Sequence, residues 1–208
     1  MTTPAPATRD LRDLPKGHLH LHMEAAMRPA TLTRLSQKLG IDEAPTTGFA
    51  GFTQFSATYR SLLASLDHPD HLGILTDEIF ADQAAQGVAY LELAVSPQFY
   101  AERYGTVEAA LNELIALARA ASAAHGVAFG LMPTIDRMRD LDEAMVIARA
   151  AAARAGDGVV SLGLANEERG YPAGDFAEPF ALAKAAGLQS TPHAGELVGP
   201  ESIRDALD

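Results

Sequence analysis

Apolar residues follow two different periods in the first part of this chain. Histidine and leucine alternate over residues 18–22, whereas leucines recur at three- and four-residue spacing after Pro29. Alternation is typical of a strand and the longer period of a helix. The pattern therefore predicts a short strand at 18–22 and a helix at 29–39. Two further helices are expected at about 52–65 and 70–86.

From residue 88 onward, short apolar runs alternate with longer segments of helical periodicity. Nearly continuous apolar runs are typical of strands that are buried on both faces. Asp140, with Glu143 three residues later, resembles the capping box that begins a helix. Strands that alternate with helices predict an α/β protein with a parallel sheet of about five strands. The expected strands are 88–93, 127–132, 159–164 and 188–191, and the expected helices are 106–124, 140–155 and 176–186.

The composition is that of a globular protein. Of the 208 residues, 48% are hydrophobic and 21% are charged, and the formal net charge is −11. An acidic surface repels phosphate backbones, so we expect no nucleic acid partner. The apolar runs are shorter than the roughly 20 residues that a membrane helix needs, so we expect no membrane partner either.

The start of the chain and the absence of cysteine bear on the location of the protein and on its possible metal ligands. Residues 1–15 are polar, contain three prolines and lack the apolar core of a signal peptide. We therefore expect a flexible leader there, a folded domain over 16–208, and a cytoplasmic protein. Without cysteine, any metal must bind histidine or carboxylate side chains.

The alternating segment from His18 to His22 is the first candidate for chemistry. In a strand, alternate side chains share a face, so the three histidines are expected on one side and the two leucines on the other. Imidazoles two residues apart lie about 6–7 Å apart at the backbone, close enough to converge on one ion. The plain alternative is a row of solvated histidines at a strand edge.

A second candidate lies at the end of the last expected strand. His193 and Glu196 occur there in the sequence Thr-Pro-His-Ala-Gly-Glu, at the strand end where parallel α/β proteins place their chemistry. Taken alone, such a histidine fits a hydrogen-bonded core residue and such a glutamate a solvated one. With the first strand they supply three neutral imidazoles and a nearby acid, which is the composition of a catalytic zinc site with an open position.

Both segments are similar to the signature motifs of one enzyme family. Residues 16–24, Lys-Gly-His-Leu-His-Leu-His-Met-Glu, resemble the opening motif of adenosine deaminases, and residues 191–196 resemble their His-Ala-Gly-Glu motif. Further similarity covers 90–97 and 164–168, so the resemblance extends over nearly the whole chain from Leu14 onward. It implies the N-terminal portion of a metal-dependent deaminase of the amidohydrolase superfamily. The implied fold is a partial (β/α)8 TIM barrel, with about five of eight strands and helices inserted after the first.

By position, the resemblance implies one zinc ion bound by His20, His22 and His193. Glu196 is then the proton donor, and His18 lies beside the ligands rather than among them. The implied reaction is hydrolytic deamination of adenosine or a related 6-aminopurine nucleoside to an inosine-type product and ammonia. Zinc held by imidazoles activates water at neutral pH. A protonated Glu196, which calls for a buried carboxyl group, can protonate ring nitrogen N1.

The same resemblance implies residues that contact the purine nucleoside. Glu24 is expected to face a ribose hydroxyl, and His22 to face the substrate as well as the metal. Asn166 stands where the family often has a glycine whose backbone contacts the purine. Ala25 and Ala94 replace a common glycine and a common arginine, which leaves the metal site intact and the exact aminopurine open.

Two catalytic groups of the family, a second histidine and an aspartate ligand to zinc, are expected beyond residue 208. We therefore expect residues 1–208 alone to be truncated, inactive and poorly stable, because a partial barrel leaves strand edges unpaired. The sequence does not indicate an oligomeric state. His68, His71 and His125 are expected at solvated positions.

Two rival functions stay open. A binuclear-metal amidohydrolase also begins with His-x-His on its first strand. It needs a bridging lysine near the fourth strand, however, and the only lysines here are Lys16, Lys38 and Lys184. A non-catalytic zinc-binding fragment would keep its histidines without turnover. Metal content and ammonia release from adenosine separate these hypotheses.

Overall fold

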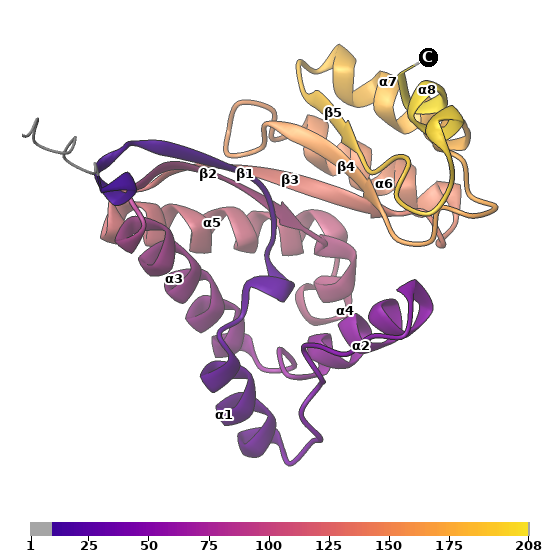
Figure 1. The fold of residues 1–208 in the computed structure, drawn as a ribbon. Coiled ribbons are helices and arrows are strands. Elements are labelled where there is room, and N and C mark those ends of the chain that lie inside the picture. The colour runs from indigo at the N-terminus through magenta and orange to yellow at the C-terminus, as the bar shows by residue number, and fades with distance from the viewer. Residues whose placement is uncertain (1–9, 208) are drawn as a thin grey trace, which may run out of the picture.

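Five parallel strands form one curved sheet (Figure 1). The structure, a computed structural model, describes residues 10–207. The strands are β1 (Lys16–His22), β2 (Val88–Val95), β3 (Ala128–Asp136), β4 (Ser161–Ala165) and β5 (Gln189–Pro192). They lie side by side in chain order, and every neighbouring pair is parallel. This order confirms the α/β class and the partial TIM barrel.

Helices connect the strands and also form the insertion between β1 and β2. They are α1 (Pro29–Leu39), α2 (Phe52–Ala64), α3 (Pro69–Ala85), α4 (Ala101–Tyr104), α5 (Val107–His125), α6 (Leu141–Ala152), α7 (Ala177–Ala185) and α8 (Pro200–Leu207). α3 and α5 pack against each other beside β2 and β3, whereas α6 and α7 pack beside β4 and β5 (Figure 1). Among residues 10–207, no helix is long and apolar enough to cross a membrane.

Local signals begin and end the helices close to where the sequence predicts. Thr106 caps α5 by accepting a hydrogen bond from the backbone N–H of Ala109 at 3.0 Å. Asp140 caps α6 in the same way, with the N–H of Glu143 at 2.7 Å. Gly126 ends α5 with a φ of 70°, a left-handed conformation that favours glycine. These contacts confirm the predicted helix starts near 106 and 140.

Strand β3 is longer than the sequence predicts. It continues from the expected end at residue 132 as far as Asp136. Proline cannot donate a hydrogen bond to a strand ladder, yet Pro133 pairs with Val95 of β2 and the strand goes on. The extension carries Asp136 to the C-terminal end of the sheet, where parallel α/β proteins bind their ligands.

Some described elements have no predicted counterpart. A 3-10 helix, η1 (Leu11–Asp13), lies within the expected leader, and Lys16 Nζ donates to the carbonyl oxygen of Leu11 at 2.6 Å. Residues 1–9 of that leader lie outside the described residues. At the other end, α8 follows the loop after β5 and was not expected from the sequence.

Strand β1 does not alternate as simply as predicted. Between His18 and Leu21 it advances three residues while β2 advances two, which makes a β-bulge. His20 lies in this bulge with a φ of 60°. Leu19 is 63% exposed, whereas Leu21 packs against the core. The expectation of one face for all three histidines and the other for both leucines is therefore wrong, because the bulge separates His18 from His20 and His22.

One histidine that was expected at a solvated position is buried. His71 is 0% exposed, and its Nδ1 lies 2.8 Å from the backbone oxygen of Ser65. The expectation is wrong for His71 because α3 packs this side against the core. His68 caps α3 and is partly exposed. His125 forms a surface contact in which its Nε2 lies 2.7 Å from Asp77 Oδ1.

Gly87, between α3 and β2, occupies a position that excludes a side chain. Its φ is 73°, and an added Cβ would lie 2.0 Å from the carbonyl oxygen of Arg12. We expect Gly87→Ala to lower the free energy of unfolding by about 2–4 kcal/mol, through left-handed strain and a backbone clash. Gly126→Ala is the matched control, because Gly126 has a φ of 70° and open space around the added Cβ. Urea denaturation measures both losses, and equal losses would contradict the role of the clash.

Candidate active site

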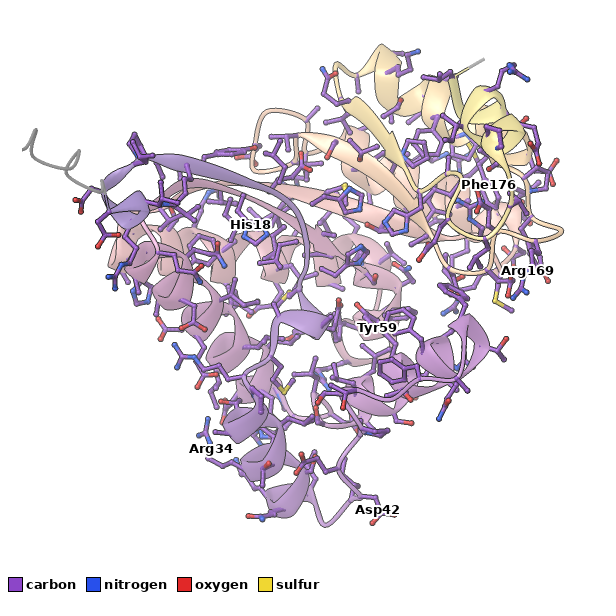
Figure 2. All side chains as sticks on the ribbon, viewed as in Figure 1. His18, Arg34, Asp42, Tyr59, Arg169 and Phe176 are labelled. Atoms are coloured by element: carbon purple, nitrogen blue, oxygen red, sulfur yellow. The ribbon has the colours of Figure 1, made fainter. Side chains whose placement is uncertain are left out.

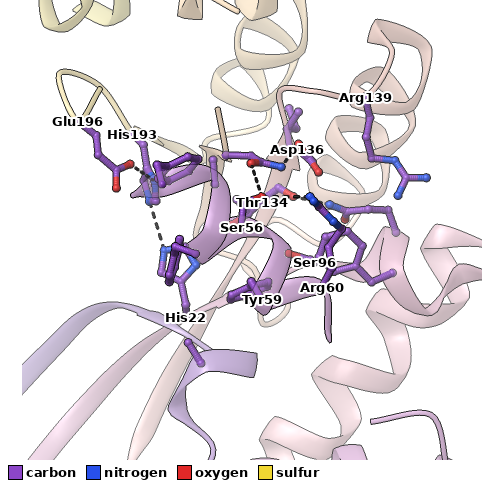
Figure 3. A pocket seen from close by; sticks show the side chains of 18 residues that line it. His22, Ser56, Tyr59, Arg60, Ser96, Thr134, Asp136, Arg139, His193 and Glu196 are labelled. Carbon is purple, nitrogen blue, oxygen red and sulfur yellow. Dashed lines mark hydrogen bonds and ion pairs between the residues drawn. The ribbon is translucent and has the colours of Figure 1, made fainter. Parts of the chain in front are cut away.

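Histidines from the two outermost strands of the described sheet meet at its C-terminal end. His20 and His22 lie at the end of β1, and His193 follows β5. Nε2 of His193 lies 2.7 Å from Nε2 of His20 and 3.2 Å from Nε2 of His22. One ring nitrogen from each residue lies within 4.8 Å of the others, and Figure 3 shows His22 and His193 turned toward each other. The structure thus brings the three predicted metal ligands together.

This histidine cluster is neutral at pH 7, and its geometry fits a zinc ion. Burial lowers the pKa of His20. Burial and the neighbouring imidazoles lower the pKa of His22 and of His193 to about 4. Each ring therefore keeps an unprotonated nitrogen with a free lone pair. Zinc binds imidazole nitrogen at about 2.0–2.1 Å, which places the ligands of a tetrahedral site about 3.3 Å apart. The donor set suits that ion. The separation of 3.2 Å between His22 and His193 matches this spacing, and the separation of 2.7 Å between His20 and His193 is shorter.

Glu196, the predicted proton donor, follows His193 by three residues and lines the same cavity. Its Oε2 lies 3.8 Å from Nδ1 of His193, and its side chain is 48% exposed. The residues that the structure describes therefore do not bury the carboxyl group of Glu196, contrary to the expectation from the sequence. His18 lies apart from the cluster, with its Nδ1 2.7 Å from Oε1 of Gln83 in α3.

Glu24, which was expected to face a ribose hydroxyl, is enclosed by two tyrosines. It is 1% exposed; Tyr59 donates to its Oε2 at 2.6 Å and Tyr100 to its Oε1 at 2.9 Å. Burial raises the pKa of Glu24, and hydrogen bonds from both tyrosine hydroxyls oppose that increase. Tyr59 lies on the side of α2 that faces the sheet (Figure 2) and lines the cavity. Glu24 thus connects the inserted helix α2 to the sheet.

The histidine cluster opens into a cavity of about 530 Å³, a volume typical of small-molecule sites. His22, His193 and Glu196 line it at the cluster, and aromatic side chains of α2 form part of the opposite wall. Asn166, predicted to contact the purine, lines the cavity with a φ of 83°. The sequence analysis did not identify several polar residues that line the cavity. Only their position at strand ends or in the insertion could have indicated them. These residues are Ser56, Tyr59, Arg60, Ser96, Gln98, Thr134, Asp136 and Arg139.

A buried carboxylate anchors the loop that carries Glu196. Glu168 is 4% exposed and accepts hydrogen bonds from the backbone N–H of Gly195 at 2.6 Å and of Leu197 at 2.7 Å, and from the hydroxyl of Ser202. Burial alone would disfavour its ionised form. These hydrogen bonds outweigh burial and lower the pKa of Glu168 to about 2. An ionised Glu168 therefore fixes the loop between β5 and α8.

A buried arginine holds the same loop from another side. Arg137 is 1% exposed, and its Nη2 donates to the carbonyl oxygen of His193 at 2.6 Å. Its Nη1 donates to the carbonyl oxygen of Tyr171 at 2.9 Å. Burial lowers the pKa of Arg137, and nearby carboxylates, Glu168 foremost, counteract this effect. His193 is therefore positioned by a hydrogen-bonded buried cation, which is the form in which buried charge is tolerated.

Sequence comparison relates this site to known proteins. The sequence profile of the adenosine deaminase family matches residues 15–208. A protein of Streptomyces virginiae, assigned as an adenosine/adenine deaminase, is 36% identical to this chain. The match covers 96% of this chain and 62% of that relative, so the chain spans less than two thirds of the relative's length.

Two solved structures share the fold. The crystal structure of an adenine deaminase from Arthrobacter aurescens has a TM-score of 0.80 at 26% identity, and the match covers 93% of this chain and 62% of that one. An amidohydrolase from Burkholderia ambifaria, with bound zinc, has a TM-score of 0.77 at 28% identity. That match covers 95% of this chain and 57% of the other. Together with the histidine cluster, the zinc in the second structure supports a metal site here.

The anchoring of the loop by Glu168 makes stability depend on pH. The pKa of Glu168 is about 2 in the folded protein, against an ordinary value of 4.5. Its stabilisation is therefore complete above about pH 5 and is lost as the pH falls through 4.5 toward 2. We expect Glu168→Gln to lower the free energy of unfolding by about 2–3 kcal/mol at pH 7, with a smaller difference at pH 3.

Urea denaturation of wild type and variant at several pH values measures this difference. Glu167→Gln is the control, because Glu167 pairs with Arg169 at the surface and such pairs contribute about 0–1 kcal/mol. A loss in Glu168→Gln that stays constant from pH 7 to pH 3 would show that ionisation of Glu168 is not its cause.

Proposed function

The chain belongs to the adenosine deaminase family, and we propose that its histidine cluster binds one zinc ion for hydrolytic deamination of adenosine or a related 6-aminopurine. The observation that carries this proposal is the meeting of three neutral imidazole nitrogens from β1 and β5. A glutamate lines the same cavity. Because the chain covers 62% of its Streptomyces relative, the reaction of the whole protein is part of the proposal.

His20, His22 and His193 would hold the zinc, which supplies a Lewis acid that makes water nucleophilic at neutral pH. Glu196 delivers a proton to ring nitrogen N1 while the oxygen of water adds at C6. The carboxyl group must be protonated to do so. The bond between C6 and the amino nitrogen then breaks. Of the two protons of the water, one goes to the amino group, which leaves as ammonia, and the other returns to Glu196. Glu168 and Arg137 keep His193 and Glu196 in place throughout.

Asn166 and His22 are proposed to contact the substrate, because both line the cavity. Glu24 contributes indirectly, because it accepts a hydrogen bond from the hydroxyl of Tyr59, which lines the cavity. The names of the relatives include adenosine/adenine deaminase and adenine deaminase. The proposal therefore covers 6-aminopurines with or without a sugar.

A binuclear-metal hydrolase is the weaker alternative. It requires a lysine at the end of the fourth strand, but β4 ends at Ala165 and the three lysines lie in β1, α1 and α7. The described residues contain a single group of three or more potential metal ligands, namely the histidine cluster. A non-catalytic zinc-binding fragment would have the same ligands, and only turnover separates it from an enzyme.

Metal content tests the ligand set. We expect about one zinc per chain in wild type and less than about one tenth of that in His20→Ala, His22→Ala and His193→Ala, because removal of one of three imidazoles leaves too few ligands. His68→Ala, a partly exposed histidine outside the cluster, is the control and keeps its zinc. Elemental analysis after dialysis measures the content. Two zinc ions per chain would favour the binuclear alternative instead.

Ammonia release tests the reaction. Because residues 1–208 alone are expected to be inactive, the test uses the zinc-loaded protein at the full length of its relatives. We expect this longer protein to release ammonia from adenosine or adenine, and Glu196→Gln in it to lower kcat by about 100- to 10,000-fold, the usual contribution of a general acid. The variant should retain its zinc, because Glu196 is not among the ligands. Zinc binding without ammonia release from either purine would favour the non-catalytic fragment, and unchanged kcat in Glu196→Gln would exclude Glu196 as the acid.

A further inference from the structure

A chain of hydrogen bonds runs along the cavity wall from α2 to β3. Arg60 Nη1 donates to Oγ of Ser56 at 3.1 Å, and Ser56 Oγ donates to Oδ1 of Asn166 at 3.1 Å. Asn166 Nδ2 then donates to Oδ1 of Asp136 at 2.9 Å. All four residues line the cavity. The chain therefore begins at a cation and ends at a carboxylate, and every link has a defined direction.

The orientation of the Asn166 amide fixes this direction. Its Oδ1 also accepts from the backbone N–H of Glu167 at 2.9 Å, so that atom must be the oxygen. The nitrogen consequently faces the carboxylate of Asp136. The backbone N–H of Met138 donates to the same Oδ1 of Asp136 at 3.0 Å. Two donors thus occupy one oxygen of Asp136 and hold the carboxylate in place.

The second carboxylate oxygen of Asp136 is left with acceptor capacity. Within residues 10–207, Oδ2 has no hydrogen-bond or ion-pair partner, and it is not among the buried unpartnered atoms. Asp136 ends β3, the middle strand of the sheet, whereas the histidine cluster is formed by the outermost strands β1 and β5. Figure 3 accordingly shows Asp136 across the cavity from His22 and His193.

Two arginines line this part of the cavity. Arg60 donates to Ser56 and has no ion pair among the described residues. Arg139, which also lines the cavity, forms an ion pair with Glu143 at 2.6 Å. The open position at Asp136 Oδ2 is a carboxylate oxygen, so it repels an anionic group and accepts a hydrogen bond from an N–H or O–H donor.

We propose that Asp136 Oδ2 accepts a hydrogen bond from the end of the ligand that lies away from the reacting amino group. In a 6-aminopurine this donor is a sugar hydroxyl of a nucleoside or the N9–H of a free base. Asp136 is then a specificity-determining residue, and Asn166 positions it. This inference rests on the proposed function, because it takes the histidine cluster as the place of reaction.

Binding of product analogues to the zinc-loaded chain tests the inference without turnover. Isothermal titration would compare inosine, hypoxanthine and 9-methylhypoxanthine, of which the last has neither a sugar hydroxyl nor an N9–H. We expect 9-methylhypoxanthine to bind roughly tenfold more weakly than the better of the other two ligands. Equal affinity for all three ligands would overturn the inference even if no variant could be purified.

Asp136→Asn is the sharper variant, because it replaces the accepting oxygen by an isosteric amide that can present a donor. We expect it to weaken the better ligand roughly tenfold or more and to leave 9-methylhypoxanthine unchanged. The ligand that loses affinity, inosine or hypoxanthine, identifies the donor as sugar hydroxyl or N9–H. Asp142→Asn, an exposed carboxylate on α6, is the matched control and binds as wild type does. Thermal denaturation verifies that both variants fold.

Failure of this inference and failure of the proposed function give different results. If wild type binds inosine or hypoxanthine and Asp136→Asn binds it equally well, Asp136 is not a ligand-binding residue, but the purine site stands. If wild type binds zinc and none of the three purines, the proposed function itself is overturned, and this inference with it.

Discussion

The site depends on bringing neutral imidazoles from opposite edges of one sheet to a single point. β1 and β5 are the outermost strands of the described sheet, so their ends meet only because the sheet curves. Because of the bulge around His20, β1 directs the imidazoles of His20 and His22 toward His193, whereas His18 contacts Gln83. A metal ion can be bound only by unprotonated ring nitrogens, and burial favours neutral rings by lowering the pKa of each. The curvature of the sheet, the bulge in β1 and the burial of the rings thus all contribute to the histidine cluster.

Buried carboxylates fix the elements on two sides of the cavity. Glu168 accepts backbone N–H groups of the loop after β5, and Glu24 accepts the hydroxyls of Tyr59 in α2 and of Tyr100. A buried carboxylate is costly unless it is hydrogen-bonded, so each contact strongly disfavours displacement of its partner. Directional contacts of this kind set positions more narrowly than apolar packing does. Under the proposed function such precision matters, because a misplacement of about 1 Å can cost an enzyme two orders of magnitude in rate.

Local signals predicted most of the helices and strands and the histidines that meet at the site, whereas long-range contacts were not predicted. The cap at Asp140 and the His-Ala-Gly-Glu motif at His193 each depend on a few consecutive residues, and the structure places both as expected. The surroundings of Glu24 depend on Tyr100, which lies 76 residues further along the chain. No local sequence pattern indicates a partner at such a distance along the chain. Asp136 was missed because β3 continues through a proline, so the sequence placed the strand end too early.

The proposed function places the reaction and the recognition of the ligand in different parts of this fold. The imidazoles lie on the outermost strands, whereas the facing wall combines the ends of β3 and β4 with the inserted helix α2. Changes in Ser56 or Arg60 would alter that wall without touching the residues that hold His193. The hydrogen-bond chain that ends at Asp136 crosses from the insertion to the sheet, so it couples the two parts at one place. Under the proposed function, variation of the insertion would change which group is accepted at N9 while the attack at C6 stays the same.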